Sequence, residues 1–233
     1  MGPSEEARRL LAALQQSHAA WLREEAWACK SGCAACCTRS VHITGLEGRE
    51  ILRYLREAGR SLEQVEAFQE AAAARPQNGP LTTNHFARLC LAGLEPPAEP
   101  ESPWDFQPCP FLTEDLCSIY PVRPMMCRAF VSKRTCQEAG SAEVPPLVLT
   151  TNTLFLQLVE HLAAGEAWGN MLTILASLQD PEYGDVGLSR AEEIPGFLIP
   201  PEEEEAVAAL WKGLAEARVG DKSLLGSILR ERG

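Results

Sequence analysis

Two groups of cysteines constrain how this chain can fold more than any other feature of its sequence. The first group, CKSGCAACC, places four of the nine cysteines within residues 29–37. The second places four more within residues 109–136, a segment that also contains Pro110, Pro121 and Pro124. Proline lacks a backbone donor and restricts the residue before it, so the second segment cannot form one continuous helix. Disulfide bonds, a metal ion, an iron–sulfur cluster and simple burial are the four explanations to separate.

Composition and charge limit where the protein can be located and which partners it can bind. The chain has 233 residues and a net charge of −11, which argues against nucleic-acid binding because phosphate contacts depend on lysine and arginine. No stretch reaches the roughly 18 apolar residues of a membrane span, and the N-terminal segment lacks the apolar run and cleavage site of a secretory signal. We therefore predict a cytoplasmic protein without nucleic-acid or membrane partners. Disulfides are rare in such a reducing compartment, so thiolates held by a metal become the leading interpretation.

Apolar periodicity predicts a mainly α fold, in which several helices pack with an irregular, proline-rich cysteine core and strands are few or absent. The predicted helices cover residues 4–28, 44–59, 61–76, 84–94, 144–165, 166–181, 200–218 and 221–232. The first would deliver Cys29 at its end, and the second begins with Thr44 and Glu47 at capping-box spacing. Only RSVHIT, residues 39–44, alternates as a strand does.

The chain divides at the end of the second cysteine group. We predict a cysteine-cluster metal-binding domain with its N-terminal helix over residues 1–140. A C-terminal helical extension over residues 141–233 would pack on the same core. Cys90 lies outside both cysteine groups in a helical pattern, and we predict that it is a small buried hydrophobic residue.

The cysteine spacing suits a preorganised metal site, because tetrahedral zinc and iron–sulfur clusters both take four thiolates. The pattern C-x3-C-x2-C-C, followed by C-P-F-L-x4-C-x-I-Y-x2-R-P-x2-C-R, resembles the YkgJ-type cysteine-cluster family of CxxCxxCC zinc- or iron-chelating domains. The resemblance covers roughly residues 29–136, and CSIYPVRPMMCR is its most specific part. It implies metal chelation by eight cysteines, namely Cys29, Cys33, Cys36, Cys37, Cys109, Cys117, Cys127 and Cys136.

Iron–sulfur is the preferred cofactor and zinc the alternative. Adjacent residues of a helix or strand point their side chains in different directions, so we expect Cys36 and Cys37 not to share one zinc ion. Related cysteine domains in flagellin lysine N-methylases are thought to hold an iron–sulfur cluster, although this chain shows no glycine-rich signature for S-adenosylmethionine. Eight thiolates could serve two four-cysteine sites or one cluster with spare ligands, and both alternatives stay open.

Basic residues accompany the cysteines within an otherwise acidic chain. Arg123 and Arg128 belong to the second group, where they would stabilise an anionic thiolate site and tune its potential. Tyr120 could either pack the loop or donate to sulfur, and we favour the second role. These three residues are the predicted cofactor contacts.

No catalytic constellation stands out, so whether the protein is an enzyme is left open. The first hypothesis is an iron–sulfur protein with a redox, electron-transfer or sensing role. The second is a zinc-stabilised interaction module whose C-terminal helices bind an unknown protein partner. The third is a metal-dependent enzyme with an open coordination position.

Overall fold

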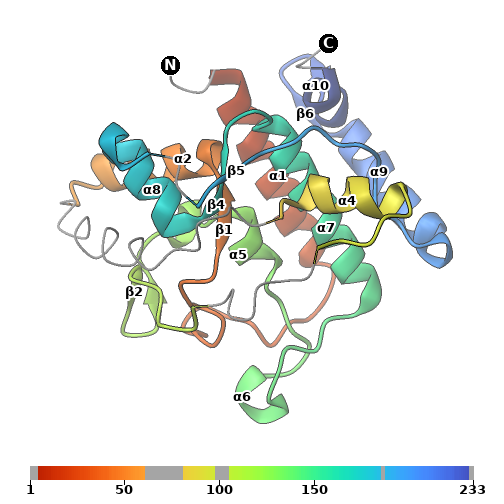
Figure 1. Ribbon diagram of the computed structural model, residues 1–233. Coiled ribbons are helices and arrows are strands. Elements are labelled where there is room, and N and C mark those ends of the chain that lie inside the picture. The colour runs from red at the N-terminus through yellow and green to blue at the C-terminus, as the bar shows by residue number, and fades with distance from the viewer. Residues whose placement is uncertain (1–4, 61–80, 98–104, 185–186, 231–233) are drawn as a thin grey trace.

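The computed structural model describes residues 5–60, 81–97, 105–184 and 187–230, and these are mostly helical (Figure 1). The helices in this part of the chain are α1 (Glu5–Leu22), α2 (Gly45–Glu57), α4 (Thr83–Leu91), α5 (Met125–Ala129), α6 (Cys136–Ala139), α7 (Pro146–Leu162), α8 (Met171–Gln179), α9 (Glu204–Glu216) and α10 (Leu224–Arg230). Short 3-10 turns cover η2 (Tyr120–Val122), η3 (Pro181–Tyr183) and η4 (Pro201–Glu203). The prediction of a mainly α fold is confirmed. The helix predicted at 61–76 lies outside the described residues.

α1 forms where apolar residues recur at helical spacing behind an acidic first turn, which the helix dipole stabilises. Leu10 and Leu14 are fully buried on its inner face. The helix ends at Leu22, so the prediction that it extends to residue 28 and delivers Cys29 is wrong. The indole Nε1 of Trp27 donates a hydrogen bond of 2.8 Å to the Leu22 carbonyl, one of the acceptors that a helix end leaves open. Cys29 therefore lies in a loop.

α2 begins at the predicted capping box. The Thr44 hydroxyl accepts a hydrogen bond of 3.2 Å from the Glu47 backbone, and the Glu47 carboxylate accepts one of 3.0 Å from the Thr44 backbone. Gly48 then lets α2 approach α8 closely, because a Cβ at this position would meet the Ile174 side chain at 2.7 Å. This packing brings α2, which directly follows the first cysteine segment, against a helix from the second half of the chain.

A three-stranded antiparallel sheet joins distant segments. β1 (His42–Thr44) pairs with β4 (Ala167–Asn170), which pairs in turn with β5 (Ser189–Arg190). The prediction of one helix over 166–181 is thus wrong in its first part, because the chain enters β4 before α8 begins. Gly169 faces the Leu188 side chain so closely that a Cβ there would lie 2.6 Å from it. Two-stranded hairpins form at β2 (Leu112–Thr113) with β3 (Leu116–Cys117) and at β6 (Arg218–Val219) with β7 (Lys222–Ser223).

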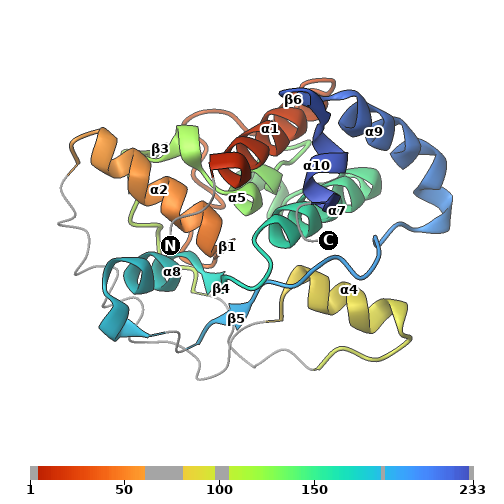
Figure 2. The ribbon, with the colours of Figure 1, turned by 90° about the horizontal axis from the view of Figure 1, so that it is seen from above.

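Two apolar clusters form the core. α1, α7, α9 and α10 share one of them, which includes the fully buried Leu154 and Phe155. α2, α8 and β1 share the other with Phe111 and Ile119, which come from the second cysteine segment. Figure 2 shows α2 and α8 together on one side of the molecule and α1, α7, α9 and α10 on the other. The core thus contains residues from both sides of position 140.

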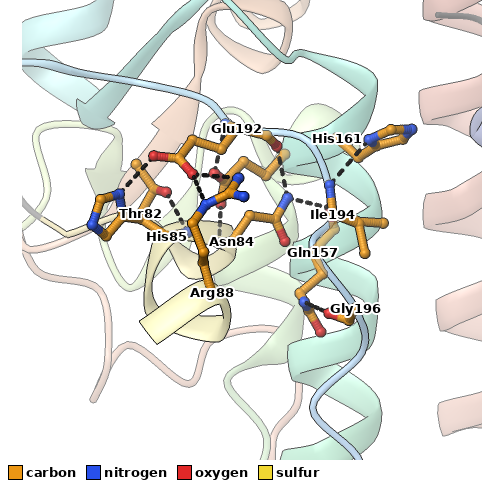
Figure 3. Close-up of polar contacts among 10 residues, drawn as sticks. Thr82, Asn84, His85, Arg88, Gln157, His161, Glu192, Ile194 and Gly196 are labelled. Carbon is orange, nitrogen blue, oxygen red and sulfur yellow. Dashed lines mark hydrogen bonds and ion pairs between the residues drawn. The ribbon is translucent and has the colours of Figure 1, made fainter. Parts of the chain in front are cut away.

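A polar network fastens α4 to α7 and to the segment after β5 (Figure 3). The Asn84 side-chain amide donates to the Glu192 carbonyl at 2.8 Å, and the Glu160 carboxylate accepts hydrogen bonds from the backbones of Asn84 and Glu192. Nearer the surface, the Glu192 carboxylate pairs with His85 at 2.6 Å and with Arg88 at 2.9 Å. α4 is therefore attached mainly by hydrogen bonds and ion pairs.

Cys90 lies in the last turn of α4 and is exposed, so the prediction that it is buried is wrong. The buried residues of this helix are Asn84 and Ala87, and Leu91 is 54% exposed. The last turn therefore extends past the anchored part. None of the helices in the described ranges has both the length and the apolar character needed to cross a membrane.

Candidate metal centre

Seven of the eight predicted ligands line one cavity of about 210 Å³. Most of the segments that carry them are loops and a short hairpin, whereas Cys127 lies on α5 in the middle of the view in Figure 1. The cavity residues include Cys29, Cys33, Cys36, Cys37, Cys109, Cys117 and Cys127, together with Tyr120, Arg123 and Arg128. Cys136 is not among the lining residues, but a Cys136 thiolate would repel a Cys29 thiolate electrostatically. The fold thus brings the two cysteine groups together.

The first cysteine segment is shaped by two consecutive turns. The backbone of Cys33 donates to the Lys30 carbonyl at 3.0 Å, and the backbone of Cys37 donates to the Ala34 carbonyl at 2.9 Å. Gly32, inside the first of these turns, adopts a φ of +85°, a conformation that costs glycine little. All four cysteines of this short loop line the cavity.

The second segment is joined to the first through its backbone. The Cys109 amide donates to the Cys37 carbonyl at 2.9 Å, next to a β-bridge between Thr38 and Pro108. The β2–β3 hairpin then places Cys117 opposite Leu112. Further along, the Ala28 amide donates to the Ser132 carbonyl at 2.9 Å, which holds the start of the first segment beside the approach to Cys136.

Buried side chains position both ends of α5, the helix that carries Cys127. At its start, the Glu47 carboxylate accepts a hydrogen bond of 2.8 Å from the Met125 amide. At its end, the Asn152 amide donates to the Ala129 carbonyl at 2.9 Å, and His18 contacts the Asn152 oxygen at 2.8 Å. Sequence reasoning found Glu47 as a helix cap and missed its second role, because no local pattern indicates a contact with Met125.

The adjacent thiols of Cys36 and Cys37 influence each other's ionisation. The two residues lie at a turn and not in a regular helix or strand, so the reason for expecting their side chains to point apart does not apply here, and whether they share one ion stays a prediction. This interaction raises the pKa of Cys36, which burial raises further, and it lowers the pKa of Cys37. Burial also raises the pKa of Cys127, and it raises the pKa of Cys109 to about 11. These shifts favour the protonated thiols of Cys36, Cys109 and Cys127 when no metal is bound.

The two predicted arginines occupy different roles around the cavity. The Arg123 guanidinium lies 4.1 Å from the centre of the Tyr120 ring, and its positive charge favours the thiolate forms of Cys36 and Cys127. Its buried Nε has no hydrogen-bond partner within the described ranges. Arg128 instead donates to the carbonyls of Arg123 and Pro121, both at 2.9 Å, and so shapes the loop. Tyr120 supports Arg123, and its predicted donation to sulfur stays a prediction.

The donor set fits a thiophilic metal, although the thiols are not yet closed around one point. Across the described residues, no three cysteine, histidine, aspartate or glutamate side chains converge closely enough to hold an ion. Thiols do surround a single cavity, with cationic groups beside them, which is the donor chemistry that zinc and iron–sulfur clusters use. Metal binding would draw these side chains together and displace their protons.

Comparison with known families gave one result. The model of a family denoted CxxCxxCC and described as "Putative zinc- or iron-chelating domain" matches residues 28–144, half of the chain. The matched range contains both cysteine groups and ends just before α7. No curated protein and no solved structure matches the chain.

Proposed function

Because the chain belongs to the CxxCxxCC family of zinc- or iron-chelating domains, we propose that the group it binds is an iron–sulfur cluster with an electron-transfer or redox-sensing role. The observation that carries this proposal is the single cavity of about 210 Å³ shared by seven cysteines. On the same measure a water molecule needs roughly 10–15 Å³, and a structural zinc site closes around one ion. A cluster of several iron and sulfide atoms makes use of both the space and the thiols.

The surroundings of the cavity support an anionic group. Four thiolates leave a zinc or iron–sulfur centre with net negative charge, which Arg123 would offset at close range. Behind the thiols, the buried side chains of Phe111 and Ile119 exclude water and lower the local dielectric. When bound, such a cluster supplies one-electron redox chemistry, and nearby charge sets its potential.

The test begins with anaerobic reconstitution of the full chain with ferrous iron and sulfide. We expect stoichiometric iron and acid-labile sulfide, and a visible absorbance that dithionite bleaches. Arg123→Gln should lower the midpoint potential, because it removes positive charge near the more negative reduced state. Arg134→Gln is the matched control, since Arg134 pairs with Glu143 and is not a cavity residue. Arg128→Ala should also lower the potential, but it would disturb the loop as well.

Zinc is the second candidate, and the turn at Cys36 and Cys37 favours it, because the objection to a shared ion assumed a regular helix or strand. In that case the protein would be a zinc-stabilised interaction module, with the C-terminal helices as its partner surface. A colourless protein with stoichiometric zinc and no labile sulfide, even after anaerobic reconstitution with iron, would overturn the iron–sulfur proposal.

A further inference from the structure

We propose that a second cavity, which shares one lining residue with the metal cavity, binds a small anionic ligand carrying a carboxylate or phosphate group. This ligand cavity has a volume of about 290 Å³ and is lined by residues of α1, α2, α5 and the turn η2. Its size is close to the lower end of small-molecule sites, which span roughly 300–1,000 Å³. It is separate from the cysteines, none of which is among its lining residues.

One face of α1 forms a wall of the ligand cavity. Side chains three and four residues apart lie on the same face of a helix. The lining residues from α1 follow these steps, namely Arg8, Leu11, Ala12, Gln15, Gln16 and Ala19. The two alanines extend only a methyl group from the helix. They therefore leave space that a longer side chain would fill.

The charged groups of the ligand cavity favour an anion, although the chain as a whole is acidic. The charged lining residues are three arginines and two glutamates, namely Arg8, Arg53, Arg128, Glu47 and Glu50. The lining thus has one excess positive charge, in a chain whose net charge is −11. A cavity lined by an excess of one charge raises the local concentration of ligands with the opposite charge.

Both glutamates already accept hydrogen bonds from the protein. The Glu50 carboxylate accepts from the Nε of Arg8 and from the Nη2 of Arg53, both at 2.7 Å. The Glu47 carboxylate is buried and accepts backbone hydrogen bonds at the starts of α2 and α5. These contacts offset the two negative charges within the protein, so the excess positive charge is available to a ligand.

Two guanidinium groups have donors left for such a ligand. Arg8 uses its Nε and Nη1 for two glutamates, and Arg128 uses its Nε and Nη2 for two backbone carbonyls. Within the described ranges, the Nη2 of Arg8 and the Nη1 of Arg128 have no hydrogen-bond partner. Guanidinium groups bind carboxylates and phosphates through charge-assisted hydrogen bonds. Gln15 and Gln16 add amides, and apolar neighbours such as Val122 suit a short carbon skeleton.

Arg128 lines both cavities and so connects the ligand to the metal centre. An anion in the ligand cavity would add negative charge beside a guanidinium that also borders the thiols. A bound ligand should therefore lower the midpoint potential of the cluster. This consequence rests on the proposed iron–sulfur function, whereas the binding itself does not depend on which metal is present.

Isothermal titration calorimetry on the full-length, metal-loaded protein tests the site. Glutarate and inorganic phosphate are titrated separately, and glutaramide is the control because it has the carbon skeleton of glutarate without its charge. We expect saturable binding of one anion per chain that weakens as the salt concentration rises, and no binding of glutaramide. Binding of glutarate alone would identify a carboxylate ligand, and binding of phosphate alone would identify a phosphate ligand.

Two substitutions with matched controls locate the binding. Ala12→Leu should abolish it because the longer side chain fills the cavity, whereas Ala20→Leu lies at an exposed position of α1 outside the lining and should have no effect. Arg8→Gln should weaken binding about tenfold or more, because it removes a charged hydrogen bond. Arg9→Gln removes the same charge from an exposed position of the same helix outside the lining, and should leave the affinity unchanged.

Two results would overturn the site. One is the absence of saturable binding of either anion, and the other is an equal loss of affinity in Arg8→Gln and Arg9→Gln. If circular dichroism shows that Ala12→Leu has not folded, Ala19→Leu replaces it.

The link to the metal centre is tested separately. A midpoint potential that stays constant while the anion binds would overturn the role of Arg128 and keep the site. Failure to form a cluster would overturn the iron–sulfur function, and the same titrations on zinc-loaded protein would still decide whether the anion site exists.

Discussion

The helical body and the cysteine region of this molecule are stabilised by different interactions. In the body, α1, α7, α9 and α10 bury large apolar side chains such as Leu154, Phe155 and Leu158 completely. The cysteine region consists of loops, short helices and a hairpin of two short strands, and its thiols line a cavity. Hydrophobic burial acts without any ligand, whereas repelling thiolates become stabilising only when a cation joins them. We therefore predict that the helical body folds without a metal and that the cysteine region depends on one.

Removal of the metal should produce the largest difference in behaviour between the two regions. Chelation with a reductant should raise hydrogen exchange by orders of magnitude in residues 29–39 and 109–136, because metal binding contributes on the order of 10 kcal/mol to folding of small thiolate sites. α7 and α10 should keep their protection, since their contacts are apolar. The measurement is hydrogen-exchange mass spectrometry on loaded and metal-free protein. Unchanged exchange around Cys33 in the metal-free protein would contradict the proposed dependence on metal.

A substitution that creates a cavity in the helical body should lower the stability of the protein without changing its metal content. Phe155→Ala removes a fully buried ring that packs edge-on against His18 at 4.9 Å, and should cost about 3–5 kcal/mol of unfolding free energy. Bound metal per folded chain should stay at the wild-type value, because the ring lies in the other apolar cluster. Leu149→Ala is the control, since Leu149 is on the same helix but 53% exposed. Urea unfolding and metal analysis together report both quantities.

Glu47 connects the two regions, so its replacement should affect both. Its buried carboxylate caps α2 and accepts the Met125 amide at the start of α5. Glu47→Ala leaves these donors unpaired and should cost about 2–4 kcal/mol, with faster exchange around Cys127. Glu47→Gln keeps one acceptor and should cost less. Glu57→Ala, at the exposed end of the same helix, should have little effect. Equal losses for Glu47→Ala and Glu57→Ala would show that Glu47 does not connect the regions.

Weakening the attachment of α4 should have the smallest effect on stability, and this effect should depend on pH. Partial burial acts to raise the pKa of Glu192, but hydrogen bonds from His85 and Arg88 outweigh it and hold this pKa below its usual value. A depressed carboxyl pKa stabilises the folded state above the unfolded pKa near 4.5, and this contribution is lost as the pH falls through the folded pKa. Glu192→Gln should therefore cost about 0.5–1 kcal/mol at pH 7 and progressively less in acid.

Urea unfolding across the acid range measures this dependence, and hydrogen exchange in α4 locates it. The exposed Glu24 offers a control, and Glu24→Gln should follow the wild-type pH profile. A cost of Glu192→Gln that stays constant from pH 7 down to pH 3 would exclude a role for the ionised carboxylate.

Local patterns in the sequence were enough for the fold class and for the class of the site. Apolar spacing predicts the helices, and the Thr44–Glu47 pair predicts the start of α2, because each depends on residues within one or two helical turns. The cysteine spacing and CSIYPVRPMMCR indicate the metal-chelating family, because a sequence motif identifies the ligand residues without any knowledge of how folding brings them together.

At other positions the tertiary structure, and not the local sequence pattern, determines the conformation. Residues 167–170 carry a helical pattern but form β4, because β1 supplies strand hydrogen bonds from the other half of the chain. Trp27 turns back to the Leu22 carbonyl and ends α1 before Cys29. Cys36 and Cys37 lie at a turn, and the Glu47–Met125 bond joins the start of α2 to the start of α5. The physical reason is common to all four, since each depends on a backbone path or a through-space neighbour that residue spacing does not encode.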